Sequence, residues 1–144
     1  MELACTYIET DKFDEVVSFY EKVFNKKSNV YTENRWVEFD FGNKLSIYNK
    51  NYDTSLINND MNNYHYNDAY KNNYNTSNTI PCNNIVIFNF YCDDLNYEYK
   101  RIKSLNICDV SEIMYVNITE PYYYFNIYDP AGNTIEICGK YIEQ

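Results

Sequence analysis

The sequence has few positive charges and no long apolar run, and both absences narrow the classes of protein it can belong to. It has 12 Lys and Arg residues against 21 Asp and Glu residues, which gives a formal net charge of −9. This charge would repel nucleic acids and anionic membrane surfaces, so neither is expected as a partner. The opening stretch MELACTYIE has no basic segment, and the sequence has no long apolar run, so we expect neither a signal peptide nor a membrane span. We therefore expect the protein to be cytoplasmic.

Patterns for metal binding and disulfide formation are also scarce. Histidine occurs once, as His65, and the 5 cysteines include no Cys-x-x-Cys pair. An odd number of cysteines without this spacing favours free thiols over a disulfide framework or a structural zinc site. Tyrosine, by contrast, occurs 18 times. Because Tyr, Asn, Lys and Ile share AT-rich codons, this abundance is by itself no evidence for binding.

Two stretches of the chain show the same order of predicted elements, separated by a polar, Asn-rich segment over residues 49–84. The pattern of the first stretch predicts a strand over 3–9, followed by a helix that is capped by Thr10 or Asp11 and ended by Asn25. It then predicts a strand near 29–33 and a hairpin over 36–49 that turns at Gly42-Asn43. The second predicts strand 85–92, a helix from Asp94 to Asn106, and strands near 113–118, 122–128 and 134–138.

This internal repeat predicts an α+β fold. We expect two βαβββ modules, residues 1–48 and 85–144, joined by linker 49–84 within a single domain. Their strands would form a curved, mostly antiparallel sheet around a cavity, with the helices outside.

Three segments in this order resemble those of the glyoxalase/bleomycin-resistance/extradiol-dioxygenase superfamily, also known as vicinal oxygen chelate proteins. They are FYEKVFNKK, FYCDDLNYEYKRIKSLNI and FNIYDPAGNTIEI. Asn25 and Asn106 stand where the superfamily has glycine, and Asn tolerates the same left-handed conformation. The resemblance implies paired βαβββ modules and a homodimer.

Metal-dependent members of this superfamily hold a divalent ion through His or Glu side chains from four strands. Here the first-strand position falls among Leu3, Ala4 and Cys5, and the other three fall at Ser46 or Tyr48, at Ile87 and at Glu136. Only Glu136 matches, and His65 would have to come in from the linker as a second ligand. We therefore expect no cofactor, with one divalent metal ion as the alternative.

Strand alternation predicts which side chains face the cavity instead. If Phe125, Ile127, Ile135 and Ile137 pack under the helices, their neighbours point the other way. The predicted ligand-binding residues are Trp36, Glu38, Asp40, Tyr48, Asn89, Tyr91, Tyr124, Asn126 and Glu136. This aromatic and acidic lining suits a small organic ligand that is cationic or aromatic.

The leading hypothesis is therefore a small-molecule-binding protein of the bleomycin-resistance type, without a catalytic metal and with no assigned catalytic residue. The alternative is a metal-dependent lyase, isomerase or dioxygenase that uses Glu136 as one ligand. A third reading is a module kept for protein–protein association, with a filled cavity. On a strand after a DPAGN turn, Glu136 also fits a plain role as a solvated polar residue.

Overall fold

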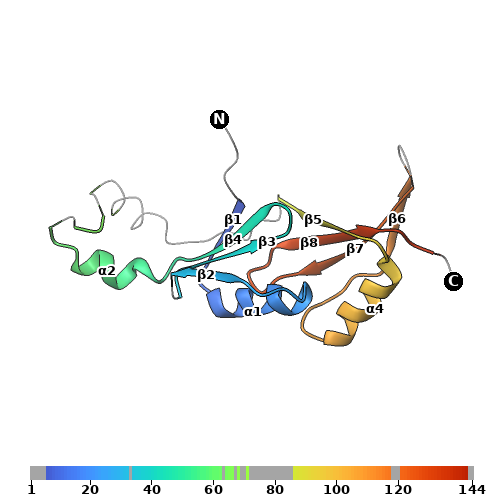
Figure 1. Ribbon diagram of the computed structural model, residues 1–144, viewed down its shortest axis with the longest axis horizontal. Coiled ribbons are helices and arrows are strands. Elements are labelled where there is room, and N and C mark those ends of the chain that lie inside the picture. Colours follow the sequence, from blue (N-terminus) through green and yellow to red (C-terminus); the bar gives the residue numbers. More distant parts are fainter. Residues whose placement is uncertain are drawn as a thin grey trace. The chain divides into compact units, whose positions relative to one another are not determined.

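The computed structural model describes residues 6–32, 34–62, 64–66, 68, 71, 86–117 and 121–142. The chain divides into two compact units, Met1–Pro81 and Cys82–Gln144. Each unit contains a four-stranded mixed sheet. In both units a strand, a helix and three further strands follow one another in the same order (Figure 1). The predicted α+β fold of two repeated modules is confirmed.

In the first unit the sheet has the strand order β1-β4-β3-β2. Its elements are β1 (Thr6–Thr10), α1 (Phe13–Val23), β2 (Asn29–Thr32), β3 (Trp36–Asp40) and β4 (Lys44–Asn49). Strands β1 and β4 run parallel, whereas β3 is antiparallel to both β4 and β2. A further helix, α2 (Asp53–Asn59), lies in the segment predicted to be a linker. The first unit therefore extends beyond its predicted strands.

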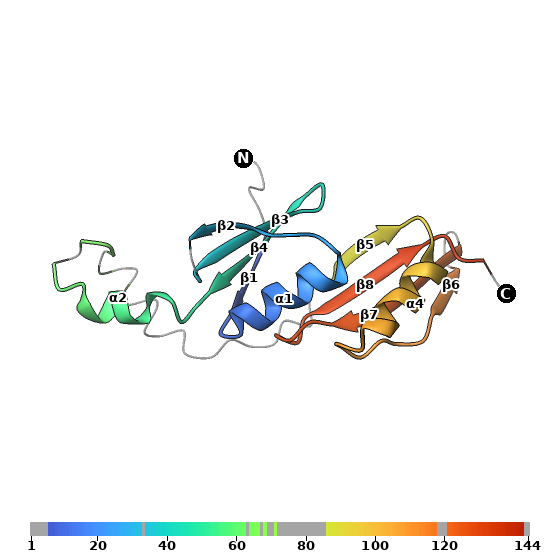
Figure 2. The ribbon, with the colours of Figure 1, turned by 60° about the horizontal axis from the view of Figure 1, so that its bottom comes forward.

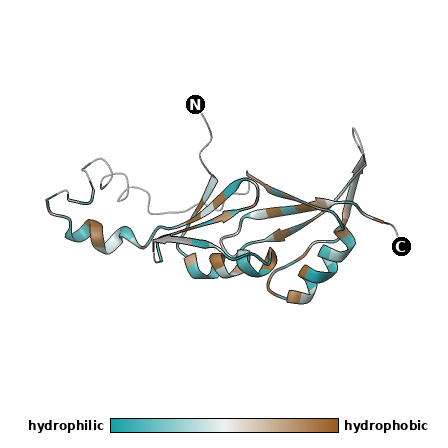
Figure 3. Ribbon diagram, in the orientation of Figure 1, coloured by the Kyte–Doolittle hydropathy of each residue, from teal (hydrophilic) through white to brown (hydrophobic). Residues whose placement is uncertain are grey.

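Helix α1 covers one face of this sheet because its apolar side chains share one side. Val16, Tyr20 and Val23 are fully buried, as are Phe39 and Ile47 from the strands. The Tyr20 and Phe39 rings lie 5.9 Å apart between centroids. Burying a large apolar side chain stabilises a fold by about 1.5–3 kcal/mol. Hydropathy alternates along the strands, as Figure 3 shows, so the opposite face is left to polar and aromatic residues.

The second unit repeats this plan with the strand order β5-β8-β7-β6. Its elements are β5 (Phe88–Cys92), α4 (Leu95–Leu105), β6 (Met114–Asn117), β7 (Pro121–Tyr128) and β8 (Thr134–Gly139). Helix α4 lies across β7 and β8 (Figure 2). Beneath it the core contains Leu95, Ile102, Phe125 and Ile135, each at most 1% exposed.

The two sheets also share their register. In the first, Ser46 of β4 pairs with Tyr7 of β1 and Glu38 of β3. In the second, Glu136 of β8 pairs with Asn89 of β5 and Asn126 of β7. Ser46 and Glu136 therefore occupy equivalent positions, each at the centre of a cross-strand row on the face away from the helix.

Most predicted helix ends are present. Asn25 and Asn106 have positive φ values of 47° and 51°, and the Asp94 side chain accepts a hydrogen bond from the Tyr97 amide at 2.9 Å. The cap predicted at Thr10 or Asp11 is wrong, because the N-cap is Lys12 and it makes no side-chain bond. Thr10 is still paired in β1, so its hydroxyl reaches only the Lys12 amide, at 3.0 Å.

The DPAGN turn is organised by the buried side chain of Asp129, which is 4% exposed. Its carboxylate accepts hydrogen bonds from the Ala131 amide at 3.0 Å, the Asn133 amide at 2.8 Å and the Asn133 side chain at 2.8 Å. Gly132 has a φ of +85°, which few side chains tolerate. These contacts fix the start of β8 and hence the register that presents Glu136.

None of the helices in the part of the chain that the structure describes is long and apolar enough to cross a membrane.

Candidate functional site

Three aromatic residues gather on the face of the first sheet away from α1. Tyr7 of β1, Trp36 of β3 and Tyr48 of β4 form what we call the aromatic platform. The Trp36 ring centroid lies 5.5 Å from that of Tyr7 and 6.5 Å from that of Tyr48. Tyr7 is 54% exposed, so part of this surface is open to solvent. The Trp36 ring is tilted by 52° to Tyr7 and by 48° to Tyr48, so a flat ligand that stacks on one ring would meet the neighbouring rings at an angle.

Two carboxylates flank the aromatic platform. Glu38 is the cross-strand neighbour of Ser46, and Glu9 is the neighbour of Tyr48. Each has a lysine partner, at 3.2 Å for Glu38–Lys44 and 3.6 Å for Glu9–Lys50. In each pair one side chain is only 12% exposed, Glu38 in the first and Lys50 in the second, and its partner is exposed. Ion pairs that water still reaches contribute about 0–1 kcal/mol, so a bound cation could compete with either lysine.

Asp40 takes a different role from the other predicted residues of this sheet. It is exposed at the end of β3, and its carboxylate accepts a hydrogen bond from the Gly42 amide at 2.9 Å. It therefore caps the hairpin turn. The structure brings Trp36, Glu38 and Tyr48 together and places Asp40 at the turn beyond them.

Ser46 lies in the same row, between Tyr7 and Glu38, and is fully buried. Its hydroxyl has no hydrogen-bond partner among the described residues. A buried hydroxyl in this state costs about 1–3 kcal/mol.

On the second sheet, Asn89, Glu136 and Asn126 form a polar row across three strands. The Asn89 amide donates to the Glu136 carboxylate, and the Cys138 thiol lies 3.3 Å from the Asn89 carbonyl oxygen. The Asn126 side-chain oxygen is buried without a hydrogen-bond partner among the described residues. The row therefore contains two kinds of acceptor, the Glu136 carboxylate and the buried amide oxygen of Asn126.

Tyr91 and Tyr124 lie beside this row, because both pair with Cys138 on the same strand face. Tyr91 is 64% exposed. All five residues that the sequence predicted in the second unit thus share one face of its sheet.

The residues that the structure describes do not supply a ligand set for a catalytic divalent ion. No three His, Cys, Asp or Glu side chains in the described ranges lie close enough together to hold one. Ser46 and Ile87 stand at two of the implied ligand positions, and Leu3, Ala4 and Cys5 lie outside the described residues. Three or four donors are the usual minimum for a protein-bound transition metal, and Glu136 supplies one.

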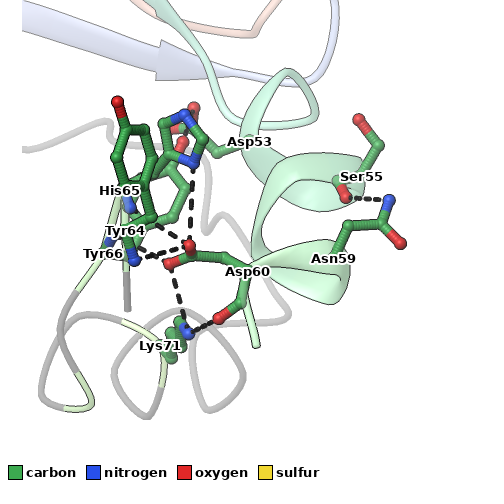
Figure 4. Close-up of polar contacts among 8 residues, drawn as sticks. All are labelled: Asp53, Ser55, Asn59, Asp60, Tyr64, His65, Tyr66 and Lys71. Atoms are coloured by element: carbon green, nitrogen blue, oxygen red, sulfur yellow. Dashed lines mark hydrogen bonds and ion pairs between the residues drawn. The ribbon is translucent and has the colours of Figure 1, made fainter. Parts of the chain in front are cut away.

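His65 belongs to a separate polar cluster after α2, shown in Figure 4. Its Nδ1 lies 3.6 Å from the Asp60 carboxylate. Asp60 also accepts hydrogen bonds from the amides of Tyr64 at 2.8 Å, His65 at 3.1 Å and Tyr66 at 2.9 Å. Burial would raise the Asp60 pKa, but these amides and the Lys71 ammonium hold it lower, at about 2. His65 thus helps to organise this segment.

Asp53, at the start of α2, is a second buried carboxylate, and its side chain is fully buried. It is bound by the hydroxyls of Tyr48 and Tyr66, each at 2.6 Å, and by the Arg35 guanidinium at 3.1–3.2 Å. Sequence reasoning missed Asp53 and Asp60, since an aspartate in a polar segment has no pattern that reveals burial. It also missed Tyr7, which strict alternation around Ile8 would have placed beside Trp36.

Two of the described thiols, Cys92 and Cys108, have pKa values shifted away from activation. Burial, with help from the charge of Glu98, raises the pKa of the Cys92 thiol to about 11. Burial also raises the pKa of Cys108. A nucleophilic cysteine requires the opposite shift, so neither is suited to covalent catalysis at neutral pH.

Comparison with family models and with curated protein sequences finds no match. Solved structures do match. Lactoylglutathione lyase from Agrobacterium tumefaciens is 20% identical with a TM-score of 0.63, covering 96% of this chain and 92% of its own. A bleomycin-binding protein in complex with bleomycin is 14% identical with a TM-score of 0.58, covering 97% and 99%.

A glyoxalase/bleomycin resistance protein/dioxygenase family enzyme from Burkholderia phytofirmans is 13% identical with a TM-score of 0.66, covering 96% of this chain and 98% of its own. The chain therefore has the fold of the vicinal oxygen chelate superfamily. Identities this low establish the fold, and the function has to be argued from the site.

Proposed function

We propose that this protein binds a small, flat organic cation on the aromatic platform, and that it acts by binding and not by metal-dependent catalysis. The observation that carries the proposal is the group of Tyr7, Trp36 and Tyr48 on one sheet face, with Glu9 and Glu38 beside it.

Each part of such a ligand has a counterpart here. A flat ring system stacks on indole and phenol faces, and a cation over such a face gains about 0.5–2 kcal/mol. The carboxylates of Glu9 and Glu38 add negative charge at the rim. The net charge of −9 raises the local concentration of cations near the surface.

The comparisons support a binding role without assigning a ligand. One protein of the same fold is described as binding bleomycin, and another is a lactoylglutathione lyase. The fold alone thus leaves both binding and catalysis open. We favour binding because no three His, Cys, Asp or Glu side chains among the described residues lie close enough together to hold a metal ion, and because Ser46 and Ile87 stand at two of the implied ligand positions. The same fold relationship leads us to propose a homodimer.

The polar row of the second unit remains a predicted part of the ligand-binding surface. The Glu136 carboxylate accepts a hydrogen bond from Asn89 and has further acceptor capacity, and the buried side-chain oxygen of Asn126 is an acceptor without a partner among the described residues. A ligand with amine or amide N–H groups would match them, whereas an anionic ligand would be repelled. Tyr91 and Tyr124 extend this surface with two further rings.

Trp36 is the chain's single tryptophan, so its fluorescence reports directly on the aromatic platform. The test is a titration with N-methylquinolinium, a flat aromatic cation, compared with quinoline, which has the same ring and is uncharged at pH 8. We expect saturable quenching by the cation and weaker binding of quinoline. Time-resolved emission separates this quenching from collisions, because only collisions shorten the lifetime of the unbound protein.

Two variants make this test specific. Tyr7→Ala removes one ring of the aromatic platform and should weaken binding about two- to twelvefold, which corresponds to the 0.5–1.5 kcal/mol of an aromatic pair. Tyr115→Ala removes a tyrosine of similar exposure, 51%, from the second unit, and it should leave the affinity for N-methylquinolinium unchanged. Quenching that never saturates, or an equal effect of both variants, would refute the proposal.

A further inference from the structure

We infer that Asp53 is a positioning residue that fixes the Tyr48 ring in the aromatic platform, so that a ligand meets the face of this ring and not its hydroxyl donor. The effect on ligand binding rests on the function proposed above. The effect on the ligand-free aromatic platform does not.

The contacts of Asp53 converge from three other parts of the first unit. Its Oδ2 accepts the Tyr48 hydroxyl from β4 at 2.6 Å and lies 3.2 Å from an Arg35 guanidinium nitrogen, just before β3. Its Oδ1 accepts the Tyr66 hydroxyl at 2.6 Å and lies 3.1 Å from Arg35 Nε, an ion pair without hydrogen-bond alignment. The carboxylate therefore links the strands of the aromatic platform to α2.

Burial makes these contacts strong. The Asp53 side chain is 0% exposed, and a buried carboxylate is retained only where charge and hydrogen bonds compensate for lost hydration. Hydrogen bonds to an ionised acceptor are short and roughly twice as strong as neutral ones. The pKa of Arg35 reports the same pairing: burial would lower it, but the Asp53 carboxylate raises it.

The consequence for Tyr48 is that both ends of its side chain are fixed. Its backbone pairs with Trp36 across the hairpin, and its hydroxyl is held by Asp53. The ring is thereby kept 6.5 Å from the Trp36 ring. Because the hydroxyl proton is already donated to Asp53, Tyr48 can recognise a ligand by stacking but has no proton to donate. This favours an aromatic cation over a carboxylate-bearing ligand.

Tyr66 provides a matched control. The Asp60 carboxylate binds the amides of Tyr64, His65 and Tyr66, which directs the Tyr66 hydroxyl back towards Asp53 (Figure 4). Tyr48→Phe and Tyr66→Phe each delete one 2.6 Å hydrogen bond to the same carboxylate. Only Tyr48 is part of the aromatic platform.

The experiment compares wild type, Tyr48→Phe, Tyr66→Phe, Asp53→Ala and Tyr48→Phe/Asp53→Ala. The first readout is the emission maximum and anisotropy of Trp36 without ligand, and the second is the affinity for N-methylquinolinium. We expect Tyr48→Phe to lower Trp36 anisotropy and weaken binding about three- to tenfold. Asp53→Ala should act similarly, and the double variant should be no weaker than Asp53→Ala alone.

Tyr66→Phe should lower the urea midpoint but leave Trp36 anisotropy unchanged and affinity within twofold. Equal effects of the two Tyr→Phe variants on Trp36, or additive losses in the double variant, would overturn the inference. If Asp53→Ala does not fold, the two Tyr→Phe variants still decide it. If wild type fails to bind the probe, the proposed function fails, while ligand-free Trp36 anisotropy still tests the role of Asp53.

Discussion

The DPAGN turn offers a direct measurement of how much one buried carboxylate contributes to the second unit. Asp129→Ala removes three hydrogen bonds at 2.8–3.0 Å, and two of their donors are backbone amides of the turn. At about 1 kcal/mol net for each bond, the expected loss is about 3 kcal/mol. That is a large fraction of the 5–15 kcal/mol that typically stabilises a folded protein.

Equilibrium urea unfolding measures this loss. With a slope of about 2 kcal/mol per molar urea, typical of a chain this size, the midpoint should fall by about 1.5 M. Asp40→Ala is the matched control, since the Asp40 carboxylate also caps a hairpin turn but does so at an exposed position, where it accepts a hydrogen bond from the Gly42 amide. It should cost under about 0.5 kcal/mol.

Equal midpoints for the two variants would refute the reasoning, because they would mean that burial of Asp129 adds nothing to its hydrogen bonds. A large drop accompanied by a changed slope would instead indicate that the second unit unfolds separately. Monitoring Trp36 fluorescence together with circular dichroism distinguishes these results, since Trp36 lies in the first unit.

Four further predictions concern single groups. Folding lowers the Asp60 pKa to about 2, so the stability that the ionised Asp60 contributes should be fully present above about pH 4 and disappear towards pH 2. In Asp60→Asn the urea midpoint should therefore depend less on pH between these values. Cys92, with a pKa raised to about 11, should react with iodoacetamide at pH 7.5 at least 100-fold more slowly than after unfolding in urea; equal rates would contradict its burial. Ser46→Ala should stabilise the protein by about 1 kcal/mol in urea titrations, since it removes an unpartnered buried hydroxyl, and destabilisation would show that the hydroxyl is satisfied. Elemental mass spectrometry should find substoichiometric metal in wild type and Glu136→Ala alike, and a stoichiometric metal lost in the variant would revive the enzyme hypothesis.

The elements that could be predicted from the sequence are those whose signals are local. Left-handed Asn25 and Asn106 end their helices, and Asp94 caps α4, because each depends on residues within one helical turn. The hairpin over β3 and β4 follows from alternation around a Gly-containing turn in the same way. Alternation along a strand also predicts which side chains share a face, so the faces of these strands could be predicted together with the strands themselves.

The residues that sequence reasoning missed depend on contacts that no local periodicity reveals. Arg35, Tyr48 and Tyr66 converge on Asp53 from positions 5 to 18 residues away along the chain, so its burial depends on the tertiary fold. Asp60 likewise relies on Lys71 and a chain reversal in a segment without apolar periodicity. The prediction that no metal is bound rests on a different kind of signal. The positions of the implied ligands could be identified in the sequence, and two of them hold Ser46 and Ile87, which are not metal ligands of this superfamily.

The shared register of the two sheets makes their central rows exchangeable parts for protein engineering. The row in the first sheet consists of Tyr7, Ser46 and Glu38. The equivalent row in the second sheet consists of Asn89, Glu136 and Asn126. Each row lies on the face away from its helix, so exchanging its side chains leaves the apolar residues between helix and sheet unchanged. Ser46 is fully buried, so an exchange at that position also has to accommodate a larger side chain. Transplanting one row into the opposite frame would give a chain with two copies of the same surface chemistry, and so a direct way to assign binding to one row or the other.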